Sequence, residues 1–151
     1  MNKLDLHTFP LFGRSLIEAS AGTGKTYTIN QLYRRAVLGH GINQKLDCTQ
    51  ILVVTFTNAA AEELRGRIRA GLRDAFENLL AAEQGVMPDP DIQRWVNELQ
   101  TDKVSSEALI KELQIWLQLN LAQMDESSIC TIHKFCAQML KRYAFDSGVA
   151  F

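Results

Sequence analysis

The sequence of 151 residues has few cysteines and almost no net charge, and each shortage excludes a class of protein. Cys48, Cys130 and Cys136 show no paired spacing of the metal-binding kind, and an odd number argues against a disulfide framework. We therefore expect a protein of the reducing cytoplasm. The formal net charge of −1 gives nucleic acid no general attraction, so a nucleic-acid site would have to come from a local group of residues.

Long apolar runs are also absent. No run approaches the roughly 20 apolar residues that span a bilayer, and the first residues do not form the basic-then-apolar pattern of a secretory leader. We therefore expect no membrane partner. The length corresponds to a single domain with a hydrophobic core of its own.

Two of the nine glycines stand where a phosphate site needs them, in the stretch ASAGTGKT at residues 19–26. The stretch has the P-loop form G-x-x-x-x-G-K-[ST], with Ala19 in place of the first glycine. Gly22 and Gly24 allow successive N–H groups to point at an anion. Lys25 supplies a positive charge for the outer phosphates, and the Thr26 hydroxyl is the usual Mg²⁺ ligand. A coincidental glycine-rich turn is the alternative, but the order strand, loop, helix favours a nucleoside triphosphate site.

The hydrophobic pattern predicts alternating strands and helices. Residues 15–18 are predicted to form the strand that leads into the P-loop, and residues 25–38 the helix that follows. The apolar run 51–56 is typical of a strand buried on both faces. Thr57 and Asn58 are predicted to cap a helix over residues 59–82. This order indicates a parallel sheet with crossover helices.

The second half is predicted to be mainly helical, with helices over residues 91–100 and 105–123, a strand over 128–132 and a last helix. That last helix is expected to turn its apolar side chains inward and its cations outward: Phe135, Met139, Leu140 and Tyr143 inward, with Lys134, Lys141 and Arg142 outward. His40 is predicted to face solvent. The acids Asp125 and Glu126 follow a helical pattern, so a Walker-B role at the end of a strand is rejected for them.

Polar and aromatic residues gather where two of the predicted strands end. Phe56, Thr57 and Asn58 follow one strand, and the stretch 131–135 follows the other. Ligands bind at the carboxyl ends of the strands in open parallel sheets. A hydroxyl beside a helix N-terminus can hold a phosphate, and an exposed aromatic ring can stack on an unpaired base for about 1–3 kcal/mol. In the alternative interpretation both phenylalanines are core residues and the threonines are helix caps.

Three stretches together resemble the motifs of superfamily 1 (UvrD/Rep-like) DNA helicases: residues 19–26 resemble motif I, residues 53–68 motif Ia, and residues 131–136 the T-x-H-x-F motif. The residues at positions 10–11, 18–22, 123–126 and 144–148 narrow the resemblance further. They resemble the branch of the superfamily in which one protein is both a helicase and a nuclease. The resemblance implies ATP and Mg²⁺ as cofactors, with Lys25 catalytic on the β and γ phosphates and Thr26 on the metal. It assigns the ATP site to Ala19, Ser20, Ala21, Gly22, Thr23, Gly24, Lys25 and Thr26. It assigns contacts with single-stranded DNA to Thr55, Phe56, Thr57, Asn58, Thr131, His133 and Phe135.

The resemblance also implies a P-loop NTPase (RecA-like) α/β fold, in the form of an incomplete motor domain. Its core would be residues 1–76 and 124–151, with a helical insertion over about 77–123. The acid pair, the arginine finger, the second motor domain and the nuclease domain have no match. We therefore expect an inactive fragment of a cytoplasmic 3′→5′ helicase and exonuclease that acts on DNA ends with two companion subunits in double-strand-break repair.

Three other functions remain open at this point: another branch of superfamily 1, a non-catalytic P-loop nucleotide-binding module, and a P-loop small-molecule kinase. Adenine recognition is also open. Helicases of the superfamily commonly carry an upstream glutamine, but no glutamine precedes Gln31. Phe9 or Phe12 could stack on adenine, or both could seal the edge of the sheet.

Overall fold

The computed structural model describes residues 4–20, 22–101 and 104–143. Ala21 and the stretch 144–148 of the sequence predictions lie outside these ranges. The elements in chain order are α1 (Lys25–Leu38), β1 (Leu52–Thr55), α2 (Asn58–Ala82), α3 (Pro90–Leu99), α4 (Ser106–Ala122), the 3-10 turn η1 (Met124–Glu126), β2 (Ser128–Thr131) and α5 (Ile132–Arg142). The five predicted helices and the two strands of the second and third motifs are confirmed. Among the described residues, no helix is both long and apolar enough to cross a membrane.

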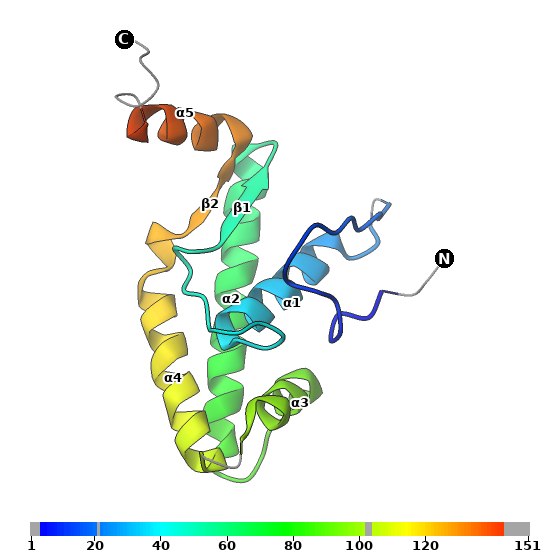
Figure 1. Ribbon diagram of the computed structural model, residues 1–151, viewed down its shortest axis with the longest axis vertical. Helices are drawn as coiled ribbons and strands as arrows, with labels where there is room; N and C mark the ends of the chain where they lie inside the picture. Colours follow the sequence, from blue (N-terminus) through cyan, green and yellow to red (C-terminus); the bar gives the residue numbers. More distant parts are fainter. Residues whose placement is uncertain (1–3, 21, 102–103, 144–151) are drawn as a thin grey trace.

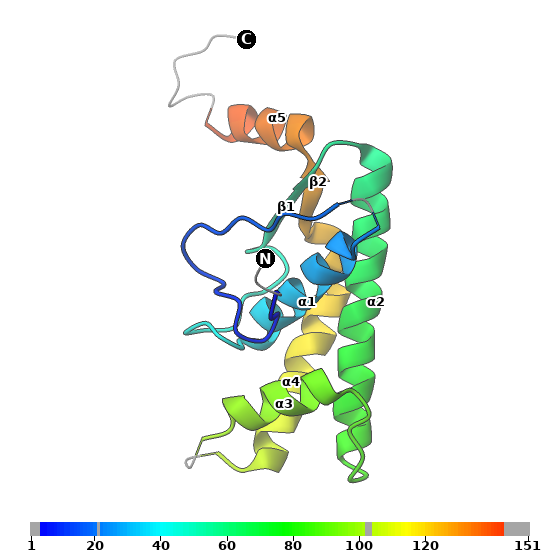
Figure 2. The same cartoon turned by 90° about the vertical axis from the view of Figure 1, so that its right-hand side faces the viewer.

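The long helix α2 runs along the molecule and carries most of the core (Figure 1). Its fully buried side chains Ile68, Leu72 and Leu79 pack with residues of α1, α3 and α4. α1 crosses α2, and α4 lies along it (Figures 1 and 2). A side chain at Gly71 would collide with the amide of Asn30, so this glycine permits α1 to approach α2 closely. α2 is unbroken at residue 77, and the predicted start of the insertion therefore lies inside a continuous helix.

The sheet has two parallel strands, and their register places Thr55 opposite Thr131. The strand predicted over residues 15–18 is wrong for this structure: the segment has no strand assignment, and Leu16 is 83% exposed. A strand requires a hydrogen-bonding partner, and no strand of the described residues pairs with this segment.

β1 is not buried on both faces, as its apolar sequence had predicted. Val53 packs against the core, but Leu52 and Val54 are 45% and 39% exposed. The sheet contacts α2 on one side, and alternate residues of a strand point to opposite faces. Leu52 and Val54 therefore project from the uncovered face.

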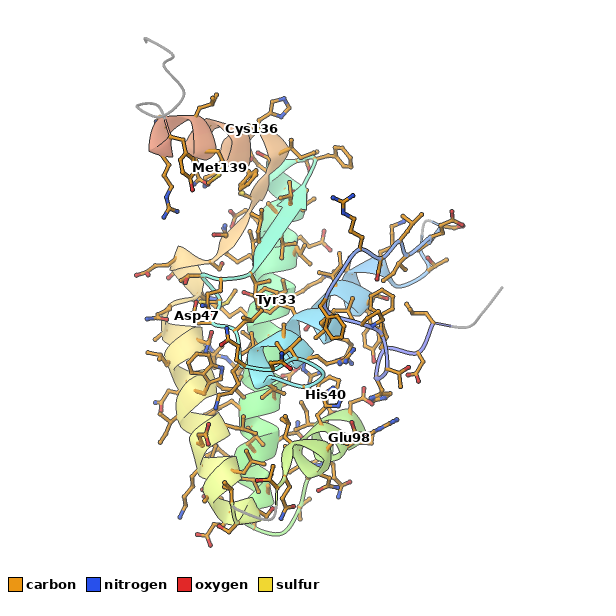
Figure 3. The ribbon with its side chains drawn as sticks, in the orientation of Figure 1. Tyr33, His40, Asp47, Glu98, Cys136 and Met139 are labelled. Atoms are coloured by element: carbon orange, nitrogen blue, oxygen red, sulfur yellow. The ribbon has the colours of Figure 1, made fainter. Side chains whose placement is uncertain are left out.

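Three polar residues at the end of α1 are buried, contrary to the amphipathic pattern and to the solvent-facing position predicted for His40. His40 is 6% exposed, and its Nε2 lies 2.5 Å from the Glu98 carboxylate on α3 (Figure 3). Its Nδ1 accepts a hydrogen bond from Arg35 Nε at 3.0 Å. Arg34 pairs with Asp89 at 2.8 Å. Each of the three side chains therefore has at least one hydrogen-bonding partner, which is the usual condition for burying a polar group.

The last helix is also less buried than predicted. No residue of α5 is fully buried; Phe135 and Met139 are half-buried, whereas Leu140 and Tyr143 are exposed. The prediction of an inward apolar face is thus wrong for two of its four residues, because the main contacts of α5 are with β1 and β2 alone. The outward position of Lys134, Lys141 and Arg142 is confirmed.

Candidate nucleotide and nucleic-acid site

The predicted phosphate-binding stretch, residues 19–26, is called here the cradle. Its lysine donates hydrogen bonds to the backbone of its own loop. Gly22 and Gly24 have φ angles of 77° and 87°, a left-handed conformation that favours glycine. Lys25 Nζ donates hydrogen bonds to the carbonyl oxygens of Ser20 at 3.0 Å and Ala19 at 3.3 Å. The Thr23 hydroxyl donates to the same Ser20 oxygen at 2.6 Å. The ammonium group therefore lies over the loop, where an anion would meet it.

Helix α1 begins at Lys25, directly after the loop, and adds its positive end to the same place. Gly24 is its N-cap, no side chain caps it, and its first turn contains no acid. The N–H groups of this turn lack intrahelical partners and suit a phosphate group. An exposed lysine, loop glycines and a helix N-terminus thus lie together, and donors of these kinds suit a phosphate group.

The Thr26 hydroxyl is the nearest candidate ligand for Mg²⁺. Among the described residues, no group of three or more His, Cys, Asp or Glu side chains could hold a metal ion. Mg²⁺ bound with a nucleotide takes most of its ligands from phosphates and water and few from protein, so one hydroxyl beside the cradle suits that mode. Thr26 also borders a pocket of about 250 Å³ between α1 and α2, lined in addition by Tyr27, Asn30 and Arg67.

The second and third motifs meet at one edge of the sheet. The β1–β2 register brings Thr55 beside Thr131, although the two are far apart in sequence. The Thr57 hydroxyl accepts from the Ala60 N–H at 3.1 Å, and the Thr131 hydroxyl accepts from the Lys134 N–H at 3.2 Å. These two threonines therefore cap α2 and α5. The cap interpretation is correct for them, and a cap at a strand end can still lie beside a phosphate.

Phe56 is not a core residue, and the core interpretation is wrong for it. Its side chain is 87% exposed in the turn between β1 and α2. Asn58, the first residue of α2, is exposed next to it, and His133 is exposed near the start of α5. Phe135 is half-buried and presents only part of its ring. The edge therefore offers one free aromatic face and several polar groups, as stacking on an unpaired base would require.

The cradle lies in the same half of the molecule as the carboxyl ends of β1 and β2 (Figures 1 and 2). The predicted residues thus form two neighbouring groups, one around the P-loop and one at the strand ends. Their assignment to ATP and to DNA stays a prediction.

Two arginines of α2 bond β2 and the turn that precedes it, a role that the sequence analysis missed. Arg65 Nη2 donates to the backbone oxygen of Ile129 in β2 at 2.7 Å, and Arg69 pairs with Asp125 in η1 at 2.5 Å. Their spacing of four residues shows that they share a line on the helix, but it does not say what they face. Asp125 is exposed in this turn before β2 and not at the end of a strand.

Phe9, one of the two aromatic residues considered for adenine stacking, lies beside the far end of α1. Arg35 Nη1 donates to the carbonyl oxygens of Phe9 at 2.8 Å and Leu6 at 2.6 Å. Arg35 is ten residues beyond Lys25, a rise of about 15 Å along a helix. This anchor places Phe9 at the far end of α1 from the cradle, which disfavours stacking of Phe9 on a base whose phosphates lie at Lys25.

Comparisons with known proteins agree with the three motifs. The model of the family described as UvrD/REP helicase N-terminal domain matches residues 5–150. The RecBCD enzyme subunit RecB of Escherichia coli is 43% identical over 152 residues, which cover 98% of this chain and 12% of the relative. RecB of Haemophilus influenzae is 44% identical over 147 residues, with 95% and 12% covered. RecB of Chlamydia trachomatis is 39% identical over 136 residues, with 90% and 12% covered.

The chain therefore spans about 12% of the length of the relatives that it matches, at their N-terminal end. The resemblance to superfamily 1, and within it to RecB, is confirmed. The matched residues include the cradle and both strand ends. The chain belongs to the family of UvrD/REP helicase N-terminal domains.

Proposed function

We propose that this chain is the N-terminal, ATP-binding part of a RecB-like motor: an ATP-dependent 3′→5′ DNA helicase and exonuclease subunit of double-strand-break repair and recombination. The observation that carries the proposal is the position of Lys25, whose ammonium lies over the glycine loop at the start of α1. A cytoplasmic complex with RecC-like and RecD-like subunits, acting on DNA ends, belongs to the same proposal and rests on the names of the relatives.

In the nucleotide site, Lys25 would exchange its bonds to Ala19 and Ser20 for the β and γ phosphate oxygens. These loop carbonyls hold the ammonium in place beforehand, so little side-chain freedom is lost when the nucleotide binds. Thr26 would hold Mg²⁺, which supplies charge neutralisation between the two phosphates. Residues 19–24 would wrap the phosphates with backbone N–H groups.

At the strand ends, single-stranded DNA would stack a base on Phe56 and set its phosphates near the N-termini of α2 and α5. Both helix starts carry a threonine cap and no acid in the first turn, so the positive ends of their dipoles face the DNA. Thr55, Thr57, Asn58, Thr131, His133 and Phe135 complete this contact surface. The surface reads no base sequence, as a translocating motor requires.

Hydrolysis needs more than this chain supplies. Phosphoryl transfer by such motors also uses a water-positioning acid and an arginine finger, and neither has a counterpart among the motifs found here. We therefore expect nucleotide binding without useful ATP turnover, measured as steady-state phosphate release in the presence of single-stranded DNA.

The nucleotide proposal is tested by titrating a fluorescent ATP analogue with Mg²⁺ into the wild-type chain and the Lys25→Ala variant. We expect Lys25→Ala to bind roughly ten- to a hundredfold more weakly, because a charge-assisted contact is worth about 1.5–3 kcal/mol. Lys111→Ala is the matched control, since Lys111 is an exposed lysine of α4 that pairs with Glu107. Equal affinity of wild type and Lys25→Ala would overturn the proposal.

A further inference from the structure

Among the described residues, no lysine or arginine of α5 pairs with an acid, whereas seven such side chains elsewhere in the chain do. The seven paired residues are Arg34, Lys45, Arg65, Arg67, Arg69, Arg94 and Lys111. Within the part of the chain that the structure describes, no ion pair involves Lys134, Lys141 or Arg142. α5 itself contains no acid. Three exposed positive charges therefore lie together on one helix of a chain whose net charge is −1.

Lys134 and Lys141 stand at positions i and i+7 and share one side of α5, called here the basic side. Arg142 lies about a quarter of a turn further round the helix. The half-buried Phe135 and Met139 lie away from the basic side, and Arg142 stands seven residues after Phe135, in line with it. All three cations are exposed to solvent. About 10 Å of helix separates Lys134 from Lys141.

The interaction of positive charges with the helix dipole accounts for two of the three cations of α5 but not for the third. Lys141 and Arg142 are in the last turn of α5, where a positive charge interacts favourably with the helix dipole. Lys134 is in the first turn, where the same dipole disfavours a positive charge. Its backbone N–H already bonds the cap residue Thr131. The side chain of Lys134 thus opposes the local electrostatics without a compensating partner among the described residues.

The location of α5 connects the basic side to the proposed DNA surface. The helix begins at Ile132, directly after β2, at the sheet edge that carries Phe56 and His133. It projects beyond the carboxyl ends of both strands, away from the core (Figure 1). A strand held at Phe56 would meet the cations of α5 next.

We propose that Lys134, Lys141 and Arg142 form a phosphate-binding track that extends the single-stranded DNA site along α5. The inference rests on the proposed function, because it takes DNA at the strand ends as its starting point. Each strand of B-form DNA carries one phosphate per 3.4 Å of duplex axis, and the phosphates of a single strand can lie farther apart, so the three cations cover at most about three phosphates. The track increases the affinity for the DNA strand and orients the strand along α5. It gives no preference for any base, since lysine and arginine contacts with phosphate carry no sequence information.

The experiment measures anisotropy of a labelled oligothymidylate over a range of salt concentrations. The test variant combines Lys134→Gln, Lys141→Gln and Arg142→Gln. For single strands the slope of log affinity against log salt is about −0.7 for each phosphate neutralised, so losing three contacts reduces the slope by about 2. The control is Arg73→Gln, which removes an exposed cation of α2 that has no ion pair among the described residues. We expect no change of slope in the control.

Charge-preserving substitution separates the track from a structural role. A Lys134→Arg and Lys141→Arg double variant keeps all three charges and is expected to keep the wild-type slope. A triple glutamine variant that matches the wild-type slope would overturn the proposal. If the triple variant loses binding but the charge-preserving variant loses it equally, the phosphate track is also wrong.

Two further measurements identify which idea fails. Phe56→Ala is expected to weaken binding at every salt concentration and to leave the slope unchanged, since stacking releases no counterions. If Phe56→Ala weakens binding and the triple variant does not, the strand-end site stands and the track is wrong. If the wild-type chain binds no oligothymidylate, both are wrong.

Vesicles of phosphatidylglycerol test the other partner of a basic amphipathic helix. Vesicle binding that needs the three cations, with oligothymidylate binding unaffected by them, would overturn the track.

Discussion

At the residue scale, α1 contacts its neighbours through polar side chains that are buried, which its sequence pattern did not predict. Arg35 is 2% exposed and joins the segment before the cradle to the end of α1. Burial lowers the pKa of Arg35, and the acids Asp5 and Glu98 oppose that effect. The amphipathic pattern of α1 cannot predict the burial of Arg35. Whether an arginine is buried depends on acceptors contributed from distant parts of the chain, here the backbone of Leu6 and Phe9.

Glu98 makes the acid stability of this cluster measurable. The hydrogen bond from Arg94, and then that from His40, lowers the pKa of Glu98 from its usual 4.5 to about 2. A carboxylate with a lower pKa in the folded state stabilises the fold above pH 4.5 and loses this contribution as the pH falls toward 2. We expect Glu98→Gln to flatten the dependence of the unfolding free energy on pH in that window. The effect is modest, because Glu98 is partly exposed.

Urea unfolding at a series of pH values between 5 and 2 measures this contribution. Glu77→Gln is the control, since Glu77 is an exposed acid of α2. A wild-type profile indistinguishable from that of Glu98→Gln would show that the His40–Glu98 and Arg94–Glu98 pairs do not stabilise the fold.

At the element scale, the sequence predicted what is local. Helix positions follow from periodicity, and the caps follow from the residue types at Thr57 and, in the alternative interpretation of the strand ends, at Thr131, each of which accepts a hydrogen bond from its helix. Strand pairing is not local. Residues 15–18 read as a strand, but a strand forms only when another one pairs with it. The exposure of α5 likewise depends on what packs against it and not on its own pattern.

Thr57 has two proposed roles, as the cap of α2 and as part of the DNA surface, and substitution separates them. Thr57→Ala removes the acceptor for the Ala60 N–H and is expected to cost about 0.5–2 kcal/mol of stability. Thr57→Asn retains a capping oxygen and is expected to keep most of that stability. Chemical denaturation of the two variants measures the difference. Equal destabilisation by alanine and asparagine would show that the cap contributes nothing.

At the scale of the whole molecule, the sheet has only two short strands among the described residues, whereas the helices make up most of the structure. Two strands lie at one end of α2, with Leu52 and Val54 uncovered on β1. A pocket of about 410 Å³ opens beside β1, lined by apolar residues that include Leu11, Ile29 and Leu52. An uncovered strand with apolar side chains is a template for association between copies.

We therefore expect the chain to self-associate as its concentration rises, and Val54→Lys to reduce this association. The added charge on an uncovered strand disfavours pairing with another chain. Sedimentation velocity over a concentration series measures the effect. Ile115→Lys is the control, because Ile115 is an exposed apolar residue on α4, away from the sheet. If Ile115→Lys reduces association and Val54→Lys does not, the contact lies on α4.

The close approach at Gly71 has a consequence for the orientation of the cradle. The amide of Asn30 bonds the Arg67 carbonyl at 2.8 Å and fills the space that a larger residue at position 71 would need. Any side chain there would have to displace this amide and break its bond to α2. Because Asn30 is little more than one turn beyond Lys25, the absence of a side chain at Gly71 on α2 sets the tilt at which α1 carries Lys25.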